Sequence, residues 1–259
     1  MPTELSISQR RTEVKEILVQ QGFVSLSELA KTLNVSESTA RRDLEVMEEQ
    51  GVGRRTHGGA VCLQSPAARL GFDERQTTAE AEKKEIARQI AAIIPDGQTV
   101  ILDGGTTCYQ VALELKGRPL LVVTNSVPIA ALLSGEVKTE ITLIGGYLYP
   151  RTGVALGTMA EEMLKNLRAA QAVMSCAAVN PDGLFNANEM MASIERRMME
   201  VADEVIVGVD HTKLSRRSIA KVCGLDRVDV LVTDGRADES CRQWLSQGVK
   251  RLIVAEQQA

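Results

Sequence analysis

The sequence predicts two unequal domains: a small helical domain that ends in a β-hairpin, and a larger α/β domain with a largely parallel sheet. The chain has 259 residues, more than the roughly 100 to 200 of a typical single domain. Its first sixty residues show the apolar period of short helices, whereas the chain beyond residue 78 alternates short apolar runs with helical stretches. We therefore assign residues 1–62 to the first domain, 63–78 to a linker rich in Ser, Pro and Gly, and 79–259 to the second domain.

The first two helices are predicted from their apolar faces and their ends. A helix is expected over residues 8–21, where Gly22 supplies a natural stop. Ser25 followed by Glu28 is a capping-box pattern that predicts the start of a second helix. The inward face of this second helix repeats at i, i+3, i+4 and i+7 and consists of Leu26, Leu29, Ala30 and Leu33.

A third helix follows the tight connection at residues 34 and 35. Ser36 is a suitable N-cap, and Gly51 ends the helix. Its inward stripe consists of Ala40, Leu44 and Met47. At about 100° per residue, the opposite side of the helix carries Ser38, Arg41, Arg42 and Glu45. Two adjacent arginines are therefore expected to point into solvent together.

The segment after this helix predicts a hairpin. Residues 52–61 place two glycines between short β-prone pieces, and they carry Arg54, Arg55 and His57. Two short helices joined by a tight turn and followed by a basic hairpin are typical of a winged helix-turn-helix, whose second helix enters the major groove of DNA. The candidate DNA-binding residues are Ser36, Ser38, Thr39, Arg41, Arg42, Arg54, Arg55 and His57. The alternative is that the two helical arginines are solvated surface charges.

The second domain reads as a series of βαβ units. A long helix is predicted from about residue 79 to 94. It precedes the apolar runs TVILD, LLVVT, ITLIG, AVMSCAAV, EVIVGVD, VDVLVTD and RLIVA. Continuous apolar runs are typical of parallel strands that are buried on both faces.

The clearest candidate ligand site is the sequence LDGGTT, where a predicted strand ends before a helix. Glycines at 104 and 105 let the backbone approach a ligand closely, and N–H groups and hydroxyls at a helix N-terminus bind anions. Other strands also end in small or polar groups, at Thr124 to Ser126, at Gly145 and Gly146, and at Asp210 to Lys213. In a parallel sheet these ends share one edge, which predicts a polar pocket where Lys213 supplies positive charge. Alternatively, Lys213 is an exposed loop lysine.

Residues 22–61 closely resemble the DeoR family of bacterial repressors. The motif of this family runs from the second helix through the RRDL segment to the HGGAV hairpin, and the whole ordered series is present here. The order DGGTT, VVTNS, LIGG, a DG-containing loop and D-x-x-K in the second domain is similar to the same family. The resemblance therefore covers nearly the whole chain.

The resemblance implies a sensor domain that is similar to ribose-phosphate isomerase and binds phosphorylated sugars or related metabolites. Residue by residue, it assigns the effector contacts to Asp103, Gly104, Gly105, Thr106, Thr107, Thr124, Asn125, Gly146, Glu189 and Lys213. His211 and Thr212 stand where the family usually has small hydroxyl residues, and Arg196 and Arg197 stand near a usual lysine. Because of these departures, the identity of the effector is not carried over.

Composition sets further limits. Hydrophobic residues make up 44% and charged residues 25%, which is ordinary for globular proteins, and no apolar run approaches the roughly 20 residues that span a bilayer. The N-terminal residues do not resemble a secretory signal, so a cytoplasmic location is expected. The five cysteines form no CxxC pair, which predicts neither a metal site nor a disulfide framework, and no cofactor is expected. The net charge of −4 does not exclude DNA, because DNA responds to the local patch.

These observations favour a ligand-controlled repressor that binds operator DNA as a homo-oligomer and is released by a phosphorylated sugar effector. One alternative is an enzyme, a sugar-phosphate isomerase with an accessory DNA-binding domain, because Asp, Glu and Lys at the strand ends could transfer protons. Another is an activator or an architectural DNA-binding protein of the same family.

Overall fold

The structure is a computed structural model, and it describes residues 7–21, 23–56, 59–62 and 72–256. The chain divides into two compact units, one of residues 1–70 with 217–219 and the other of residues 71–216 with 220–259.

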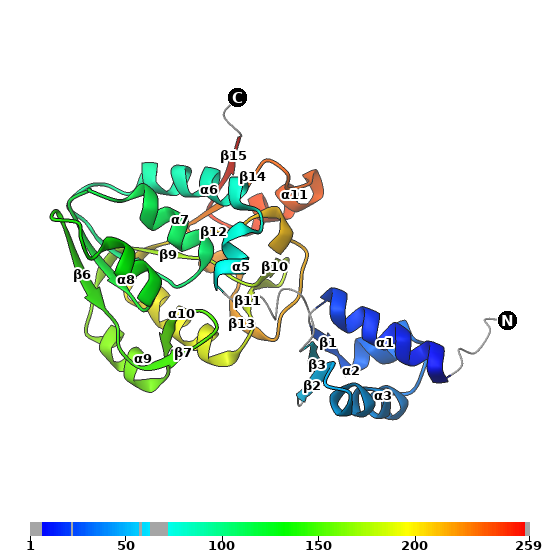
Figure 1. The fold of residues 1–259 in the computed structure, drawn as a ribbon. Coiled ribbons are helices and arrows are strands. Elements are labelled where there is room, and N and C mark those ends of the chain that lie inside the picture. Colours follow the sequence, from blue (N-terminus) through cyan, green and yellow to red (C-terminus); the bar gives the residue numbers. More distant parts are fainter. Residues whose placement is uncertain (1–6, 22, 57–58, 63–71, 257–259) are drawn as a thin grey trace. The chain divides into compact units, whose positions relative to one another are not determined.

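The first unit consists of three helices and a small antiparallel sheet (Figure 1). The helices are α1 (Ile7–Gln21), α2 (Leu26–Thr32) and α3 (Glu37–Glu49). The strands are β1 (Phe23–Ser25), β2 (Gly53–Thr56) and β3 (Gly59–Cys62), in the order β1-β3-β2. Helices α2 and α3 with the β2–β3 hairpin make the predicted winged helix-turn-helix.

Local sequence signals account for these helix boundaries. The Ser25 hydroxyl accepts the Glu28 N–H at 3.2 Å, and the Ser36 hydroxyl accepts the Thr39 N–H at 3.2 Å, so both predicted N-caps are present. Asn34 takes a positive φ of 52° in the turn between α2 and α3, a conformation that asparagine tolerates better than most residues. The predicted inward residues Ala40, Leu44 and Met47 are buried in the core of this unit. The prediction for Gly22 lies outside the described residues.

The second unit is built on a seven-stranded parallel sheet in the order β15-β14-β12-β9-β4-β5-β6. Its strands are β4 (Thr99–Leu102), β5 (Leu120–Thr124), β6 (Thr139–Leu143), β9 (Ala169–Met174), β12 (Ala202–Gly208), β14 (Val230–Asp234) and β15 (Arg251–Ala255). This confirms the predicted α/β class. Because all seven strands run the same way, their carboxyl ends lie along one edge of the sheet.

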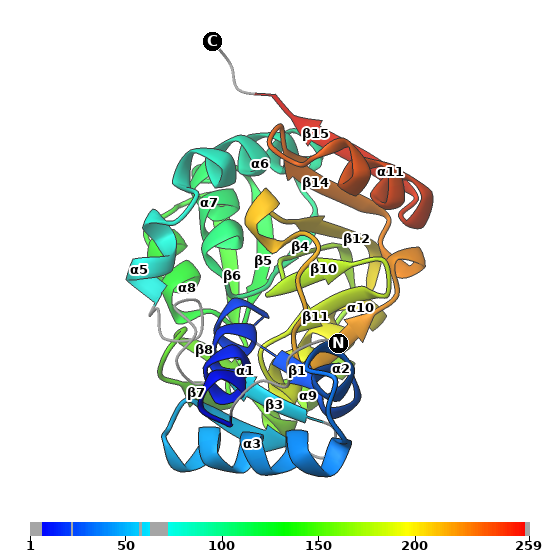
Figure 2. The same ribbon diagram turned by 90° about the vertical axis from the view of Figure 1, so that its right-hand side faces the viewer.

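Helices cover both faces of this sheet (Figures 1 and 2). Helices α6 (Glu80–Ile93), α7 (Thr106–Glu114) and α8 (Val127–Leu133) pack side by side on one face. Helices α9 (Thr158–Lys165) and α10 (Glu189–Glu200) contact each other, with α10 against β9 and β12, and α11 (Glu239–Gly248) packs on β15. The main core lies between the sheet and α6 to α8 and includes Ile86, Ile90, Val111 and Ile129.

Two small antiparallel sheets were not predicted. One is β10-β11-β13, formed by Ala178–Asn180, Gly183–Asn186 and Ala220–Cys223, and the other is the hairpin of β7 (Tyr147–Tyr149) and β8 (Val154–Leu156). The apolar run AVMSCAAV was expected to be one strand, but it divides between β9 and β10, because residues 175–177 leave the main sheet. Its continuous hydrophobicity does not distinguish one long strand from two short ones in different sheets.

The predicted linker is partly helical. Helix α5 (Phe72–Thr77) lies within the range 63–78 and belongs to the second unit. Phe72 packs edge-to-face on Tyr109 of α7, with ring centroids 5.5 Å apart. A six-residue helix is not stable by itself, so this contact with α7 explains a helix that the local sequence does not predict.

Candidate functional site

One candidate surface is the outer face of α3. Ser38, Arg41 and Arg42 are exposed, whereas Ala40 and Leu44 on the opposite side are buried. Within the described part of the chain, neither arginine makes an ion pair. The orientation predicted from helical periodicity is therefore present, and both guanidinium groups are available to an anionic partner.

Hydroxyl groups gather at the N-terminus of α3. The Ser36 hydroxyl lies 2.8 Å from the Ser38 hydroxyl and 2.9 Å from the Thr39 hydroxyl. All three belong to the first turn, where backbone N–H groups and the helix dipole favour a negatively charged group. This turn suits contact with a DNA phosphate.

Asp43 anchors α3, a role that the sequence analysis did not assign to it. It is buried, with 1% of its surface exposed, and it pairs with two arginines of α1. Arg10 donates from Nε at 2.6 Å and from Nη2 at 3.3 Å, and Arg11 donates from Nε at 3.3 Å. The bond to Asp43 also raises the pKa of Arg10. This pairing fixes α3 against α1 and so sets the direction of its outer face.

Replacing Asp43 by alanine is expected to destabilise the first unit by about 1 to 3 kcal/mol, because the bonds between charged groups are lost and Arg10 is left half-buried without its partner. Urea unfolding followed by circular dichroism would measure the loss. Arg88→Ala, which breaks an exposed pair with Glu85, is the matched control and should cost well under 1 kcal/mol. Equal effects of the two substitutions would mean that the Asp43 pair does not hold α3.

The two described arginines of the basic hairpin differ in their surroundings. Arg55 donates to Glu45 at 2.6 Å and to Glu48 at 2.9 Å, and its backbone N–H also donates to Glu48. The backbone and side-chain bonds from Arg55 lower the pKa of Glu48, and together with the bond to Glu45 they tie the hairpin to α3. Arg54 is exposed on the same strand. His57, the third basic residue predicted here, lies outside the described residues.

The second candidate site is the turn between β4 and α7 in the sensor unit. Asp103, Thr106 and Thr107 are all buried, and α7 begins at Thr106 without a side-chain cap. Close packing requires glycine at only one of the two glycine positions, because a Cβ on Gly104 would lie 2.0 Å from Val154 of β8. Glycine at position 104 therefore lets the backbone of the turn lie close to β8 at the edge of the sheet.

Burial raises the pKa of Asp103 to about 7, although N–H groups of Gly104 and Ser175 donate to the carboxyl group and oppose this shift. Glu195 of α10 is a second buried acid near it, with 2% of its surface exposed, and burial and the nearby Asp103 raise its pKa. Asn186 donates to one oxygen of Glu195, and the other oxygen has no hydrogen-bond partner among the described residues. Two acids thus share the interior behind the turn.

The raised pKa of Asp103 predicts a pH-dependent stability. Between pH about 4 and about 7 the folded state holds a proton on Asp103 that the unfolded state releases, so the contribution of Asp103 to stability falls as pH rises through this range. The unfolding free energy of Asp103→Asn, taken relative to that of the unsubstituted protein, should therefore be higher at pH 8 than at pH 5. Chemical unfolding of both proteins at the two pH values measures this. A difference that is the same at both values would contradict the prediction.

Two of the predicted effector residues, at the end of β5 and directly after it, make internal bonds. Thr124 donates to the carbonyl oxygen of Leu102 at 2.7 Å and accepts the Ser126 N–H at 3.1 Å. The amide nitrogen of Asn125 donates to Ala155 at 3.2 Å, whereas its buried Oδ1 has no partner among the described residues. Thr124 joins β4 to β5, and Asn125 keeps an acceptor for a further donor.

Two further predicted effector residues, Gly146 and Glu189, have surroundings that differ from those of the β4–α7 turn. Gly146 has a φ of 149°, and a Cβ there would lie 2.7 Å from the carbonyl oxygen of Leu156, so the backbone requires glycine. The side chain of Glu189 on the first turn of α10 is 71% exposed and pairs with Arg196. Of the three glutamates on α10, the buried one is Glu195, six residues after Glu189.

Lys213 lies in the short helix η1 (His211–Lys213), which follows β12 and is half-buried. Burial raises the pKa of the Cys176 thiol. The nearby Glu195 adds to this rise, and the charge of Lys213 opposes it. Lys213 and the acids behind the Asp103 turn are therefore grouped at the same edge of the sheet, as the order of the strands predicts.

Two cations of this region were missed by the sequence analysis. Lys83 of α6 is 3% exposed and donates to the carbonyl oxygens of Arg75 and Thr78, both at 2.5 Å. Burial lowers the pKa of Lys83 to about 8, Asp210 opposes this shift, and Lys213 and Arg75 add to it. Arg75 of α5 lies near Asp103. Arg75 lies in the predicted linker and Lys83 in the helix predicted from about residue 79 to 94, and nothing in the local pattern marks Lys83 or the guanidinium nitrogens of Arg75 as buried.

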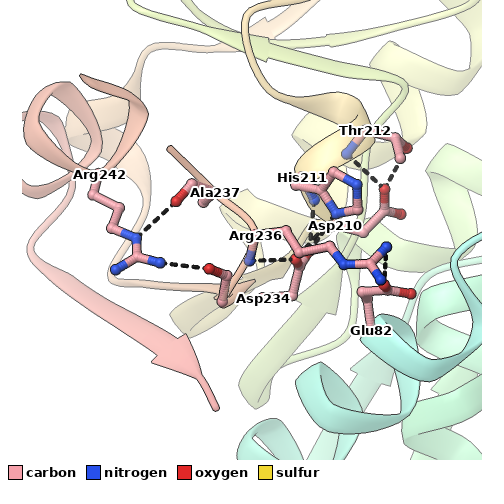
Figure 3. A network of polar contacts seen from close by, with 9 residues as sticks. Glu82, Asp210, His211, Thr212, Asp234, Arg236, Ala237 and Arg242 are labelled. Carbon is pink, nitrogen blue, oxygen red and sulfur yellow. Dashed lines mark hydrogen bonds and ion pairs between the residues drawn. The ribbon is translucent and has the colours of Figure 1, made fainter. Parts of the chain in front are cut away.

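A polar network holds the loop that carries Lys213 (Figure 3). Asp234, at the end of β14, accepts the His211 N–H at 2.6 Å and the Arg236 N–H at 2.9 Å, and it contacts the His211 ring at 3.0 Å. The Arg236 guanidinium reaches Glu82 of α6 at 2.7 Å. Within the described residues, no group of His, Cys, Asp and Glu is arranged to hold a metal ion.

Comparison with protein families matches both units. The DeoR-like helix-turn-helix domain matches residues 10–66, and the DeoR C terminal sensor domain matches residues 78–235. The chain belongs to the DeoR family. It is a DeoR-type DNA-binding transcriptional regulator with a sensor domain for a small effector. None of the described helices in this regulator is both long and apolar enough to cross a membrane.

Several curated proteins are similar to this DeoR-family chain over most of its length. The HTH-type transcriptional repressor GlcR of Bacillus subtilis is 31% identical and covers 96% of both chains. The lactose phosphotransferase system repressor of Lactococcus lactis and the glycerol-3-phosphate regulon repressor of Escherichia coli are each 32% identical, over 92% of this chain and 95% of the relative. All three relatives are named as transcriptional repressors, which favours a regulator over the isomerase alternative.

Among solved structures, ribose 5-phosphate isomerase A of Methanocaldococcus jannaschii matches 54% of this chain and 56% of its own, with 17% identity and a TM-score of 0.39. The eIF2B beta subunit of Chaetomium thermophilum matches 84% of this chain and 62% of its own, with 11% identity and a TM-score of 0.42. At TM-scores below 0.5, neither likeness bears on what this chain does.

Proposed function

We propose that this DeoR-family chain represses a sugar or related metabolite operon in the cytoplasm and is released from its operator by a phosphorylated sugar effector. The effector binds the sensor unit and shifts the protein toward a form with low affinity for DNA. The observation that carries the effector class is the Asp103–Thr107 turn, which offers backbone N–H groups and hydroxyls at the start of α7, at the same sheet edge as Lys213.

The DNA contacts are proposed to come from the first turn and outer face of α3, where Arg41 and Arg42 are exposed and unpaired among the described residues. The proposed set is Ser36, Ser38, Thr39, Arg41, Arg42, Arg54, Arg55 and His57. Arg55 would act mainly by fixing the hairpin, because its guanidinium already pairs with Glu45 and Glu48.

The effector contacts are proposed to centre on the turn and on Lys213, with Asn125 Oδ1 as an acceptor. Two relatives support a phosphorylated ligand, since their names refer to a glycerol-3-phosphate regulon and to a lactose phosphotransferase system. Thr124 and Gly146 shape the site from behind, and Glu189 contributes from its rim, where its exposed side chain pairs with Arg196.

We also propose that the chain is a homo-oligomer, because helix-turn-helix proteins read paired half-sites as symmetric dimers. Light scattering after size-exclusion chromatography would measure the mass directly. A monomer at micromolar concentration, with and without DNA, would remove this part of the proposal.

The test of the effector class is a calorimetric titration of the full chain with phosphorylated and unphosphorylated forms of the same sugars, such as ribose 5-phosphate against ribose. The phosphorylated sugars should bind. At a free concentration of 100 times its dissociation constant, such a sugar phosphate should raise the unfolding free energy of the chain by about 2.7 kcal/mol. The member that binds should also release the protein from a DNA duplex that it selects from a randomised pool. Equal affinity for a sugar and its phosphate would contradict the proposal.

A further inference from the structure

Arg75 of α5 has two buried guanidinium nitrogens that no described residue satisfies. Its Nε and Nη2 atoms are both buried, and neither has a hydrogen-bond partner among the described residues. Buried polar groups are nearly always hydrogen-bonded, and a buried charge without a partner is costly. These two nitrogens form one edge of the guanidinium plane, the edge that binds carboxylates and phosphates through two parallel bonds.

The same chain shows what this edge normally does. Arg10 uses the same two atoms, Nε and Nη2, to bind the two carboxylate oxygens of Asp43 at 2.6 and 3.3 Å. Arg10 and Arg75 therefore present the same edge, but of these two only Arg10 has an acidic side chain of the described residues against it. The difference points to an anion that is not part of the chain.

The surroundings of Arg75 also favour an anion. Arg151, in the loop between β7 and β8, is close enough to add to the effect of burial in lowering the pKa of Arg75. Asp103 is the nearby acid, but its carboxyl group accepts N–H groups of Gly104 and Ser175 and makes no bond to Arg75. Two arginines thus lie beside the effector turn without an acidic partner that bonds to Arg75, which suits a ligand with more than one negative charge.

We infer that Arg75 is an anion-binding residue of the effector site, whose Nε and Nη2 bind two oxygens of a phosphate or carboxylate group on the ligand, with Arg151 beside it. This inference rests on the proposed function for the location of the site. It adds α5 to the effector site. Because α5 is the first described element after residues 63–71, the effector would contact the sensor unit where the chain enters it from the DNA-binding unit.

The test is a comparison of Arg75→Met with the unsubstituted full chain, by thermal unfolding against increasing sodium phosphate at constant ionic strength. Methionine has a similar length but removes the charge and the donors. Without phosphate, Arg75→Met should unfold at the same temperature as the unsubstituted chain or higher, because the unpaired buried charge is gone. The phosphate concentration that produces a given stabilisation should rise by about ten- to a hundredfold, as expected on losing two charge-assisted bonds. Arg88→Met, on the exposed side of α6, is the matched control and should keep the phosphate response.

Three outcomes are decisive. If Arg75→Met responds to phosphate like the unsubstituted chain while Lys213→Ala does not, this inference is overturned and the proposed site stands. The reverse result supports Arg75 and removes Lys213 from the site. If neither phosphate nor the phosphorylated sugars stabilise the unsubstituted chain, both proposals fail.

Should Arg75→Met not fold, Arg75→Lys keeps the charge but lacks the two-donor edge. It should still bind phosphate about tenfold more weakly. A response of Arg75→Lys equal to that of the unsubstituted chain would show that the edge is not used.

Discussion

Replacing Lys213 by alanine is expected to weaken binding of the phosphorylated effector by roughly ten- to a hundredfold. The ammonium group of Lys213 adds a charge-assisted hydrogen bond to the phosphate, which is typically worth about 1.5 to 3 kcal/mol, and each 1.4 kcal/mol is tenfold in affinity. Titration calorimetry with the phosphorylated sugar that binds the unsubstituted protein measures the change. DNA binding without effector should be unaffected, so in cells this variant should repress but resist induction.

Lys138→Ala is the matched control, because it removes the same charge from an exposed position of the same unit. If both substitutions change effector affinity equally, Lys213 acts through overall charge and not through contact with the ligand. If Lys213→Ala abolishes DNA binding as well, the residue supports the fold of the unit and its assignment to the effector site is wrong.

The second large effect is expected for Arg42→Ala, which should weaken binding to the selected DNA duplex by about tenfold and reduce the log–log salt slope by about one. Arg42 is exposed on the outer face of α3, and loss of one phosphate contact releases about one fewer counterion. Fluorescence anisotropy from 50 to 300 mM salt measures affinity and slope in one experiment.

Lys138→Ala again serves as the control of equal charge, and it should leave the salt slope unchanged. A loss of affinity with an unchanged salt slope would mean that Arg42 contacts a base edge and not a phosphate. Unchanged affinity and unchanged slope would mean that the outer face of α3 does not meet DNA.

Local chemistry in the sequence accounts for the helix caps, the helix faces and the strands. The serine caps at 25 and 36 mark the starts of α2 and α3, and the apolar stripe of α3 decides which side carries Arg41 and Arg42. Continuous apolar runs likewise indicate the strands of the parallel sheet, and their common direction brings the Asp103 turn and Lys213 to one edge. These features depend on periodicity and capping over a few residues, which the sequence contains in full.

Which side chains are buried together depends on packing between distant segments of the chain. Asp43 meets Arg10 across 33 residues, and Arg55 meets Glu45 across ten, and no local pattern connects these pairs. Helix α5 lies in the predicted linker, because the segment around it loses periodicity and collects Ser, Pro and Gly. Packing on Tyr109 nevertheless makes these residues a helix, in which Nε and Nη2 of Arg75 are buried.

The same holds for α10, where the resemblance pointed to Glu189 while the structure buries Glu195 beside Asp103. Whether an ionisable group is exposed, paired or left without a partner depends on elements that arrive from distant parts of the chain. The free energy of that choice comes from desolvation and from bonds formed after folding, so it is a property of the packed structure and not of the local sequence.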